Sequence, residues 1–224
     1  MGEAIGQILP LAVGVALSPV PIIAVVLMLT TPRAGSNGLA FVVGWLLGLA
    51  VIGAIVLAVA DPAGASENGE PAAWASWLKL VLGLLLLLVA VRQFRGRPQA
   101  GEQASLPKWM SAIDRFGPGK AFGGGAVLAG LNPKNLLLAI SAGVTVAQTG
   151  ISTGQQAVAY GVFAVLGTIG VGAPVGLYVA MGRRSAELLG RLKDWMAAHN
   201  AVIMAVLCLV IGTKLIGDAI TGLT

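Results

Sequence analysis

The chain has 224 residues, of which 57% are hydrophobic and only 10% charged, and its mean hydropathy is +0.89. Soluble domains carry about 25% charged residues, so this composition excludes an ordinary soluble domain and indicates several membrane-spanning helices. The net charge of +5 does not indicate nucleic-acid binding, because the basic residues lie beside apolar segments, and a single cysteine with a single histidine excludes an internal disulfide and a transition-metal site.

Six apolar segments are long enough to cross a bilayer, which takes about 20 helical residues. Their approximate bounds are 4–31, 38–60, 74–91, 121–147, 157–181 and 201–216. We therefore predict an all-α polytopic membrane protein with six transmembrane helices, forming a single membrane domain over residues 1–224. The N-terminal stretch MGEAIGQ has an acidic residue and no basic one, so the first segment is predicted to be a permanent span rather than a signal peptide.

The first apolar segment is interrupted near its middle by the sequence ALSPVPII, residues 16–23. Proline removes a helical hydrogen bond and disfavours helix in the residue before it. Serine is a preferred N-cap, and proline is favoured at the first helical position. Ser18 and Pro19 therefore predict that one helix ends and another begins inside the span, with Pro21 as a second disruption. A continuous but kinked helix is the alternative.

The fourth segment repeats this pattern in GLNPKNLL, residues 130–137, where Asn132 precedes Pro133. An odd number of spans in each half reverses the orientation of the second half. We therefore predict two inverted three-helix repeats, residues 1–93 and 121–224, joined by a basic cytoplasmic linker at 94–120. Interrupted spans at corresponding positions of two repeats indicate the central substrate site of a transporter.

Lys134 lies inside the fourth span, in the first turn of the second half-helix, where the helix dipole disfavours a cation. No acidic residue lies deep in any span. Two interpretations stay open: Lys134 pairs with a charge on the substrate, or it bonds backbone carbonyls freed by the break. The same alternatives apply to the neighbouring asparagines. The predicted substrate-binding residues are Ser18, Pro19, Pro21, Asn132, Pro133, Lys134 and Asn135; no catalytic residue, metal or cofactor is expected.

Eleven of the lysines and arginines fall in or beside three loops, and two lie on the other side of the predicted membrane. The positive-inside rule places these loops in the cytoplasm and both termini outside. Anionic lipids are the expected partners of the basic loops. Residues 183–198 are amphipathic and are predicted to form an interfacial helix before the sixth span. Glycine pairs at four-residue spacing indicate close helix packing: Gly44/Gly48, Gly119/Gly123 and Gly172/Gly176.

The motifs SPVP in the first span and LNPKN in the fourth resemble the LysE superfamily of six-span exporters. The fuller match resembles its peptidoglycolipid-addressing (GAP) branch, also called sulfolipid-addressing proteins, over nearly the whole chain. This resemblance implies a plasma-membrane protein that exports a surface glycolipid or its precursor toward the cell envelope. Amino-acid exporters of the superfamily tend to have Gly-Pro where this chain has Ser18-Pro19, which weakens an amino-acid substrate.

Three functions are compatible with the sequence. The first is export or flipping of a cell-envelope lipid or glycolipid, with an anionic headgroup, across the plasma membrane. The second is export of small water-soluble metabolites such as amino acids, and the third is a non-transporting scaffold for envelope-lipid assembly. A second copy of the chain and envelope-lipid synthesis or export proteins are further expected partners. No nucleotide-binding motif is present, and no enzymatic activity is expected.

Overall fold

The computed structural model describes residues 1–60, 64–67, 70–97, 110, 113 and 115–224. The described chain is almost entirely helical, and a short antiparallel pair of two-residue strands, β1 (Ser66–Glu67) and β2 (Glu70–Pro71), lies between the third and fourth helices. The helices are α1 (Gly2–Ala16), α2 (Pro19–Leu29), α3 (Ala34–Ala60), α4 (Ala73–Arg95), α5 (Pro118–Gly130), α6 (Pro133–Ala147), α7 (Thr153–Met181), η2 (Gly182–Ser185, a 3-10 turn) and α8 (Ala186–Thr221). Most of the predicted linker lies outside the described residues.

Four helices, α3, α4, α7 and α8, are each long and apolar enough to cross a membrane. The other four form two bent pairs: α1 and α2 meet at 51°, and α5 and α6 meet at 66°. Counting each bent pair as one broken span gives six spans in the described chain. The prediction of a helical protein with several membrane spans, interrupted at both proline motifs, is confirmed at this level.

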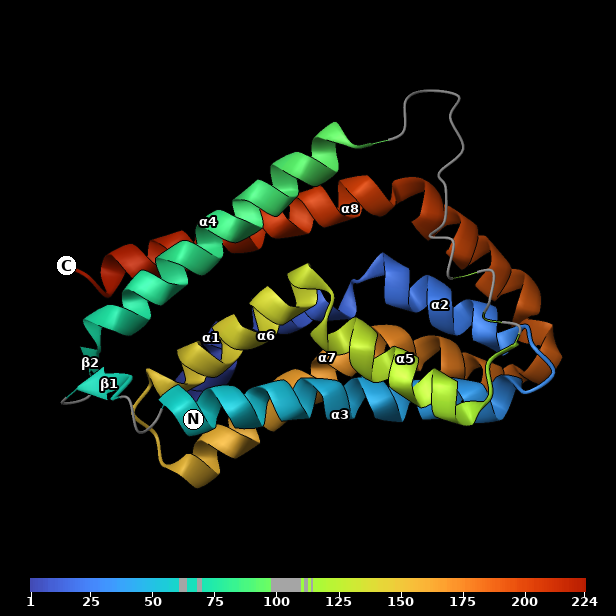
Figure 1. Ribbon diagram of the computed structural model, residues 1–224, viewed down its shortest axis with the longest axis horizontal. Coiled ribbons are helices and arrows are strands. Elements are labelled where there is room, and N and C mark those ends of the chain that lie inside the picture. Colours follow the sequence, from blue (N-terminus) through green and yellow to red (C-terminus); the bar gives the residue numbers. More distant parts are fainter. Residues whose placement is uncertain (61–63, 68–69, 98–109, 111–112, 114) are drawn as a thin grey trace.

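The helices lie roughly along one long axis, so the molecule has two distinct ends (Figure 1). At one end α2 and α7 finish while α3, α5 and α8 begin. This end carries Arg33, Arg115, Lys120 and Arg184, and we call it the basic end. At the opposite end α6 and α8 finish and α7 begins, and the C-terminus lies there (Figure 1).

Helix α8 is one continuous helix of 36 residues. Residues 186–198, which belong to the predicted interfacial segment, are its first part, and the position of this segment at a membrane interface stays a prediction. Leu189 and Met196 of this part are buried, whereas Leu188 and Trp195 on its other faces are exposed. The rest of α8 packs along α4. Apart from α8, helix α4 contacts mainly α6.

Glycines bring helix backbones into contact at two side-by-side pairs. A methyl group added at Gly44 of α3 would collide with the carbonyl of Phe122 on α5, and one at Gly125 of α5 would collide with the carbonyl of Phe41 on α3. At the other pair, a methyl group at Gly170 of α7 would collide with a carbonyl on α1. These positions therefore require glycine for steric reasons.

The predicted glycine pairs divide into one success and two failures. Gly44 and Gly48 both face the backbone of α5, as close packing requires. No other part of the described chain lies within 4 Å of a methyl group added to the remaining four glycines, so the prediction is wrong for Gly119, Gly123, Gly172 and Gly176. The spacing is the same, but those glycines face away from neighbouring helices. By contrast, Gly83 of α4 and Gly212 of α8 have no glycine at four-residue spacing in their own helices, yet each lies against the other's carbonyl.

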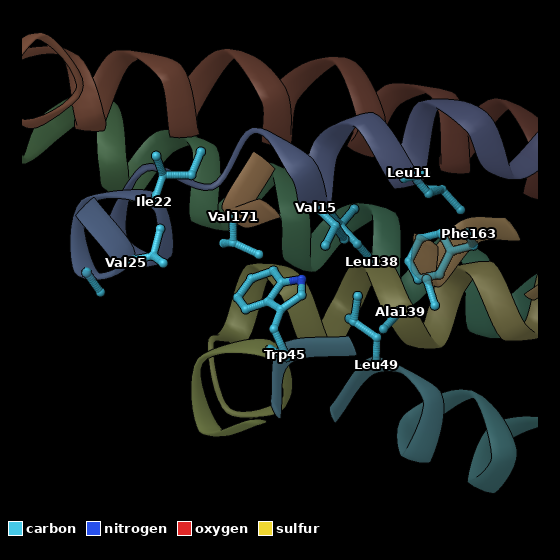
Figure 2. Packing of buried hydrophobic residues seen from close by; sticks show 14 of the residues in the cluster. Leu11, Val15, Ile22, Val25, Trp45, Leu49, Leu138, Ala139, Phe163 and Val171 are labelled. Atoms are coloured by element: carbon cyan, nitrogen blue, oxygen red, sulfur yellow. The ribbon is translucent and has the colours of Figure 1, made fainter. Parts of the chain in front are cut away.

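A buried apolar cluster surrounds the break between α1 and α2 (Figure 2). Val15 lies before the break and Ile22 after it, and Leu138 of α6 lies beside Val15 (Figure 2). Trp45 of α3 is fully buried in this cluster, and its indole Nε1 donates to the carbonyl of Gly167 on α7 at 3.3 Å. The interrupted backbone is therefore held inside the protein, where its polar groups need partners from other helices.

Candidate functional site

The breaks of the two interrupted spans are joined by direct hydrogen bonds. The ammonium of Lys134, in α6, donates to the Ser18 hydroxyl at 2.7 Å and to the carbonyl of Gly14, in α1, at 2.6 Å. The Ser18 hydroxyl lies 2.8 Å from Oδ1 of Asn135 and 2.7 Å from the Val15 carbonyl, and with a single proton it donates to one of them at a time. We call Ser18, Lys134, Asn135 and the Gly14 carbonyl the central cluster.

The Gly14 carbonyl lacks its usual helical partner because of the break. In a continuous helix it would accept from the amide four residues later, but Ser18 has an extended backbone with φ −100° and ψ 103°. The Lys134 ammonium replaces that amide. It also lies at the C-terminal end of α1, where the helix dipole favours a cation. Lys134 therefore bonds a backbone carbonyl freed by a break, as one of the two interpretations expects. That carbonyl, of Gly14, belongs to the other broken span.

The proline motifs begin their helices as predicted, but their caps differ. Pro19 and Pro133 are the first residues of α2 and α6. The side chain of Asn132 accepts a hydrogen bond from the Lys134 amide at 3.1 Å, so the predicted cap is confirmed there. The same prediction is wrong for Ser18, which makes no capping bond because its hydroxyl is engaged inside the central cluster.

Pro21 does not disrupt the first span a second time. It lies in the first turn of α2, which continues unbroken to Leu29. A first-turn residue has no intrahelical partner for its amide, so a proline there costs α2 no hydrogen bond. The predicted second disruption is therefore wrong, and Pro19 and Pro21 are both buried packing residues.

The central cluster is closed in this conformation. Ser18 and Lys134 are 1% exposed and Asn135 is 0% exposed. Asn135 also donates to the carbonyl of Leu128 on α5, which satisfies backbone at the second break. Of the other predicted site residues, Asn132 is half-buried and Pro133 is exposed at the bend. The side chains of this cluster are therefore out of reach of a ligand in this conformation.

The Lys134 ammonium can donate three hydrogen bonds, and the described part of the chain supplies two acceptors for them. No carboxylate among the described residues pairs with it. A cation in a membrane interior is costly without an opposite charge or a wet cavity. Nor do the described residues include a group of three or more His, Cys, Asp or Glu side chains that could hold a metal ion.

Two adjoining cavities open at the basic end. One, of about 380 Å³, is lined by Thr31, Pro32, Arg33, Arg115 and Phe116. The other, of about 390 Å³, lies between the ends of α2 and α7 and the start of α8, and shares Thr31 and Pro32 with the first. The α5 N-cap Gly117 has the Arg33 guanidinium beside it. Parallel helices α3 and α5 both begin here, so two positive helix ends reinforce the charge of the arginines.

The model of one protein family, described as Sap, sulfolipid-1-addressing protein, matches residues 8–221. The chain belongs to this family. The matched residues include both breaks and the whole central cluster, with the contact between Lys134 and Gly14. No curated protein and no solved structure matches the chain. The chain is therefore a multi-pass helical membrane protein of a lipid-addressing family.

Sequence reasoning missed two features of this sulfolipid-1-addressing family member. Gly14 was not a candidate, because its role depends on its main-chain carbonyl rather than on a side chain. Arg33 and Arg115 were treated only as topological charge, although they line one cavity. The available signal for both was position: Gly14 lies four residues before the serine of the first proline motif, Arg33 directly precedes α3, and Arg115 lies three residues before α5.

Proposed function

We propose that the protein exports or flips an envelope lipid or glycolipid with an anionic headgroup across the plasma membrane, without catalysing a chemical reaction. The observation that carries this proposal is the buried Lys134 ammonium, which joins the two breaks and has no carboxylate partner among the described residues. An anionic headgroup would supply the missing charge. The family description, sulfolipid-1-addressing, supports a sulfated lipid as the substrate class.

The proposed transport uses two inverted repeats, α1–α4 and α5–α8, in the manner expected of the LysE superfamily. Exchanging the halves converts the α3–α5 contact into the α7–α1 contact, and each has a glycine against a backbone carbonyl, Gly44 in one and Gly170 in the other. The same exchange maps the α4–α8 contact onto itself. In that contact Gly83 and Gly212 each face the other's carbonyl. Rocking one repeat against the other would open the central cluster to each side in turn.

The proposed orientation places the basic end in the cytoplasm and both termini outside. Arg33, Arg115, Lys120 and Arg184 at that end support it, because cytoplasmic loops carry the excess of basic residues. A headgroup from the cytoplasmic leaflet would first meet the cavity with Arg33 and Arg115, which binds anionic lipids in this proposal. It would then displace the Gly14 carbonyl and Ser18 hydroxyl from the Lys134 ammonium.

A reconstituted flipping assay tests the proposal. The protein is placed in phosphatidylcholine vesicles with a fluorescent, NBD-labelled sulfatide, and dithionite quenching measures transfer between leaflets. Lys134→Ala and Lys134→Arg should slow transfer at least tenfold, whereas Lys214→Ala, which removes an ion pair with Asp218 near the end of α8, should not. If both Lys134 variants transfer the lipid as fast as the parent protein, the central-cluster proposal is wrong.

Vesicle and cell experiments separate the other two functions. Release of radiolabelled amino acids from loaded vesicles without sulfatide transfer would favour the metabolite exporter. Normal envelope lipids in cells carrying Lys134→Ala, but not in cells lacking residues 98–109, would favour the scaffold.

A further inference from the structure

One face of α6 is polar from the central cluster to the opposite end. Lys134, Ser141, Thr145 and Gln148 are spaced by seven, four and three residues, which places them on one side of a helix. All four are buried, with Ser141 and Thr145 0% exposed and Gln148 4% exposed. The stripe begins at the break in the fourth span and ends at the C-cap of α6.

Much of this polar face has no hydrogen-bond partner among the described residues. The Thr145 hydroxyl and both side-chain polar atoms of Gln148 are buried and unpaired. Ser141 bonds only to the carbonyl of Leu137, one turn back in its own helix. Burying an unpaired polar group costs free energy, and an apolar side chain would pack at these positions without that cost. The polar groups therefore indicate a partner that is absent from this conformation.

The corresponding half of the first span has no such stripe. Helix α2, from Pro19 to Leu29, contains only proline and apolar residues, and nine of its eleven residues are buried. Polarity is therefore confined to the half-helix that leads from the central cluster to the opposite end. Helix α1 covers the stripe near its start, because Leu138 on the same face contacts Gly14.

We propose that Ser141, Thr145 and Gln148 form the outward half of the substrate path and bind hydroxyl groups of a sugar-containing headgroup. Two hydroxyls and an amide donate and accept hydrogen bonds but carry no charge, so they suit the sugar, while Lys134 suits the anionic group. This inference rests on the proposed function. When the Lys134–Gly14 bond is exchanged for substrate, α1 separates from α6 and water and sugar reach the stripe.

Cysteine accessibility tests the path without an identified substrate. In a Cys208→Ser background, single cysteines replace Ser141, Thr145 and Gln148, and a charged, membrane-impermeant methanethiosulfonate is applied from the outer side of reconstituted vesicles. Cysteines at Val146 and Ala147, which are buried on other faces of α6, are the matched controls. We expect the three polar-face cysteines to react at least tenfold faster than the controls. Ser141 decides the result, because it lies deeper than both controls.

Equal reaction rates at Ser141 and the control positions would overturn the path. That outcome is separable from failure of the proposed function, because sulfatide flipping that still depends on Lys134 would stand without it. Isosteric Thr145→Val supplies a second measurement: it should slow flipping of NBD-sulfatide at least fivefold and leave flipping of NBD-labelled phosphatidic acid, whose anionic headgroup has no sugar or other alcohol hydroxyl, within twofold. Equal effects on both lipids would contradict sugar recognition.

Discussion

At the residue scale, Lys134 occupies a position that α6 alone disfavours and α1 favours. It lies in the first turn of α6, yet its ammonium reaches the C-terminal end of α1 and replaces a missing backbone amide. Two hydrogen bonds and the negative end of a helix dipole partly offset the cost of its burial. In the proposed transport, a substrate must therefore offer a better partner than one carbonyl and one hydroxyl, which an anionic group does.

The Ser18 hydroxyl gives a stability prediction. Ser18→Ala removes one of the two acceptors of the buried ammonium, and leaving a buried charged donor unpaired costs about 1–3 kcal/mol. The apparent melting temperature in detergent, followed by tryptophan fluorescence, should fall. Thr30→Ala is the matched control: Thr30 also bonds the carbonyl three residues back, but it is exposed and bonds no lysine. Equal shifts in the two variants would contradict the role of Ser18.

The residue scale also shows where prediction from sequence stops. The Asn132 cap and the helix starts at Pro19 and Pro133 follow from local chemistry, and all three were predictable. The partner of Lys134 was not, because a carbonyl at Gly14 carries no side-chain signal and lies in another span. The hydrogen bonds of Ser18 to Lys134 and Asn135 were not predictable for the same reason, because they join two spans.

At the element scale, the helices fit together through a few glycines whose role depends on the direction they face. Gly170 lies against the carbonyl of Ala16 at the end of α1, between Gly14 and Ser18 of the central cluster. Gly172 on the same helix faces open space. A four-residue spacing in the sequence predicts a stripe on a helix, but the neighbour that the stripe faces follows only from the arrangement of helices.

Substituting these two glycines tests the packing. Gly170→Ala should lower the apparent melting temperature, because overpacking costs about 1–3 kcal/mol, and it should slow sulfatide flipping by displacing α1. Gly172→Ala should leave both unchanged or slightly raise stability, since alanine favours helix over glycine by about 1 kcal/mol. Both variants are measured side by side in one detergent. A larger loss at Gly172 than at Gly170 would contradict the close contact between Gly170 and Ala16.

At the scale of the whole molecule, composition, apolar segment lengths and the two proline motifs were enough to predict a helical membrane protein with broken first and fourth spans. They were not enough to predict that the amphipathic segment, which contains Leu189 and Met196, forms one continuous helix with the sixth span. Proline and capping patterns mark where a helix starts or stops, and the continuation of a helix carries no such mark. Nor did they predict that α4 packs mainly on α8, which depends on contacts between residues more than 100 positions apart.

The orientation of the whole molecule is testable with reporter fusions in a bacterial membrane. Alkaline phosphatase fused after Thr224 should be active, because the C-terminus is expected outside, and the same enzyme inserted within residues 98–109 should be inactive. Replacing Arg33, Arg115 and Lys120 together by glutamine should weaken this asymmetry. Phosphatase activity at the linker in the parent sequence would place the basic end outside the cell. It would contradict the proposed orientation and make the polar face of α6 the inward half of the substrate path.

The contact between Lys134 and Gly14 also bears on how the protein is assembled in the membrane. The Gly14 carbonyl obtains its partner from a residue 120 positions farther along the chain. While the first three spans are being synthesised, that carbonyl has no lysine to pair with, and hydrocarbon offers no water in its place. The N-terminal half is therefore an unfinished folding unit. Its first span must stay loosely inserted, or be shielded by the insertion machinery, until α6 has entered the bilayer.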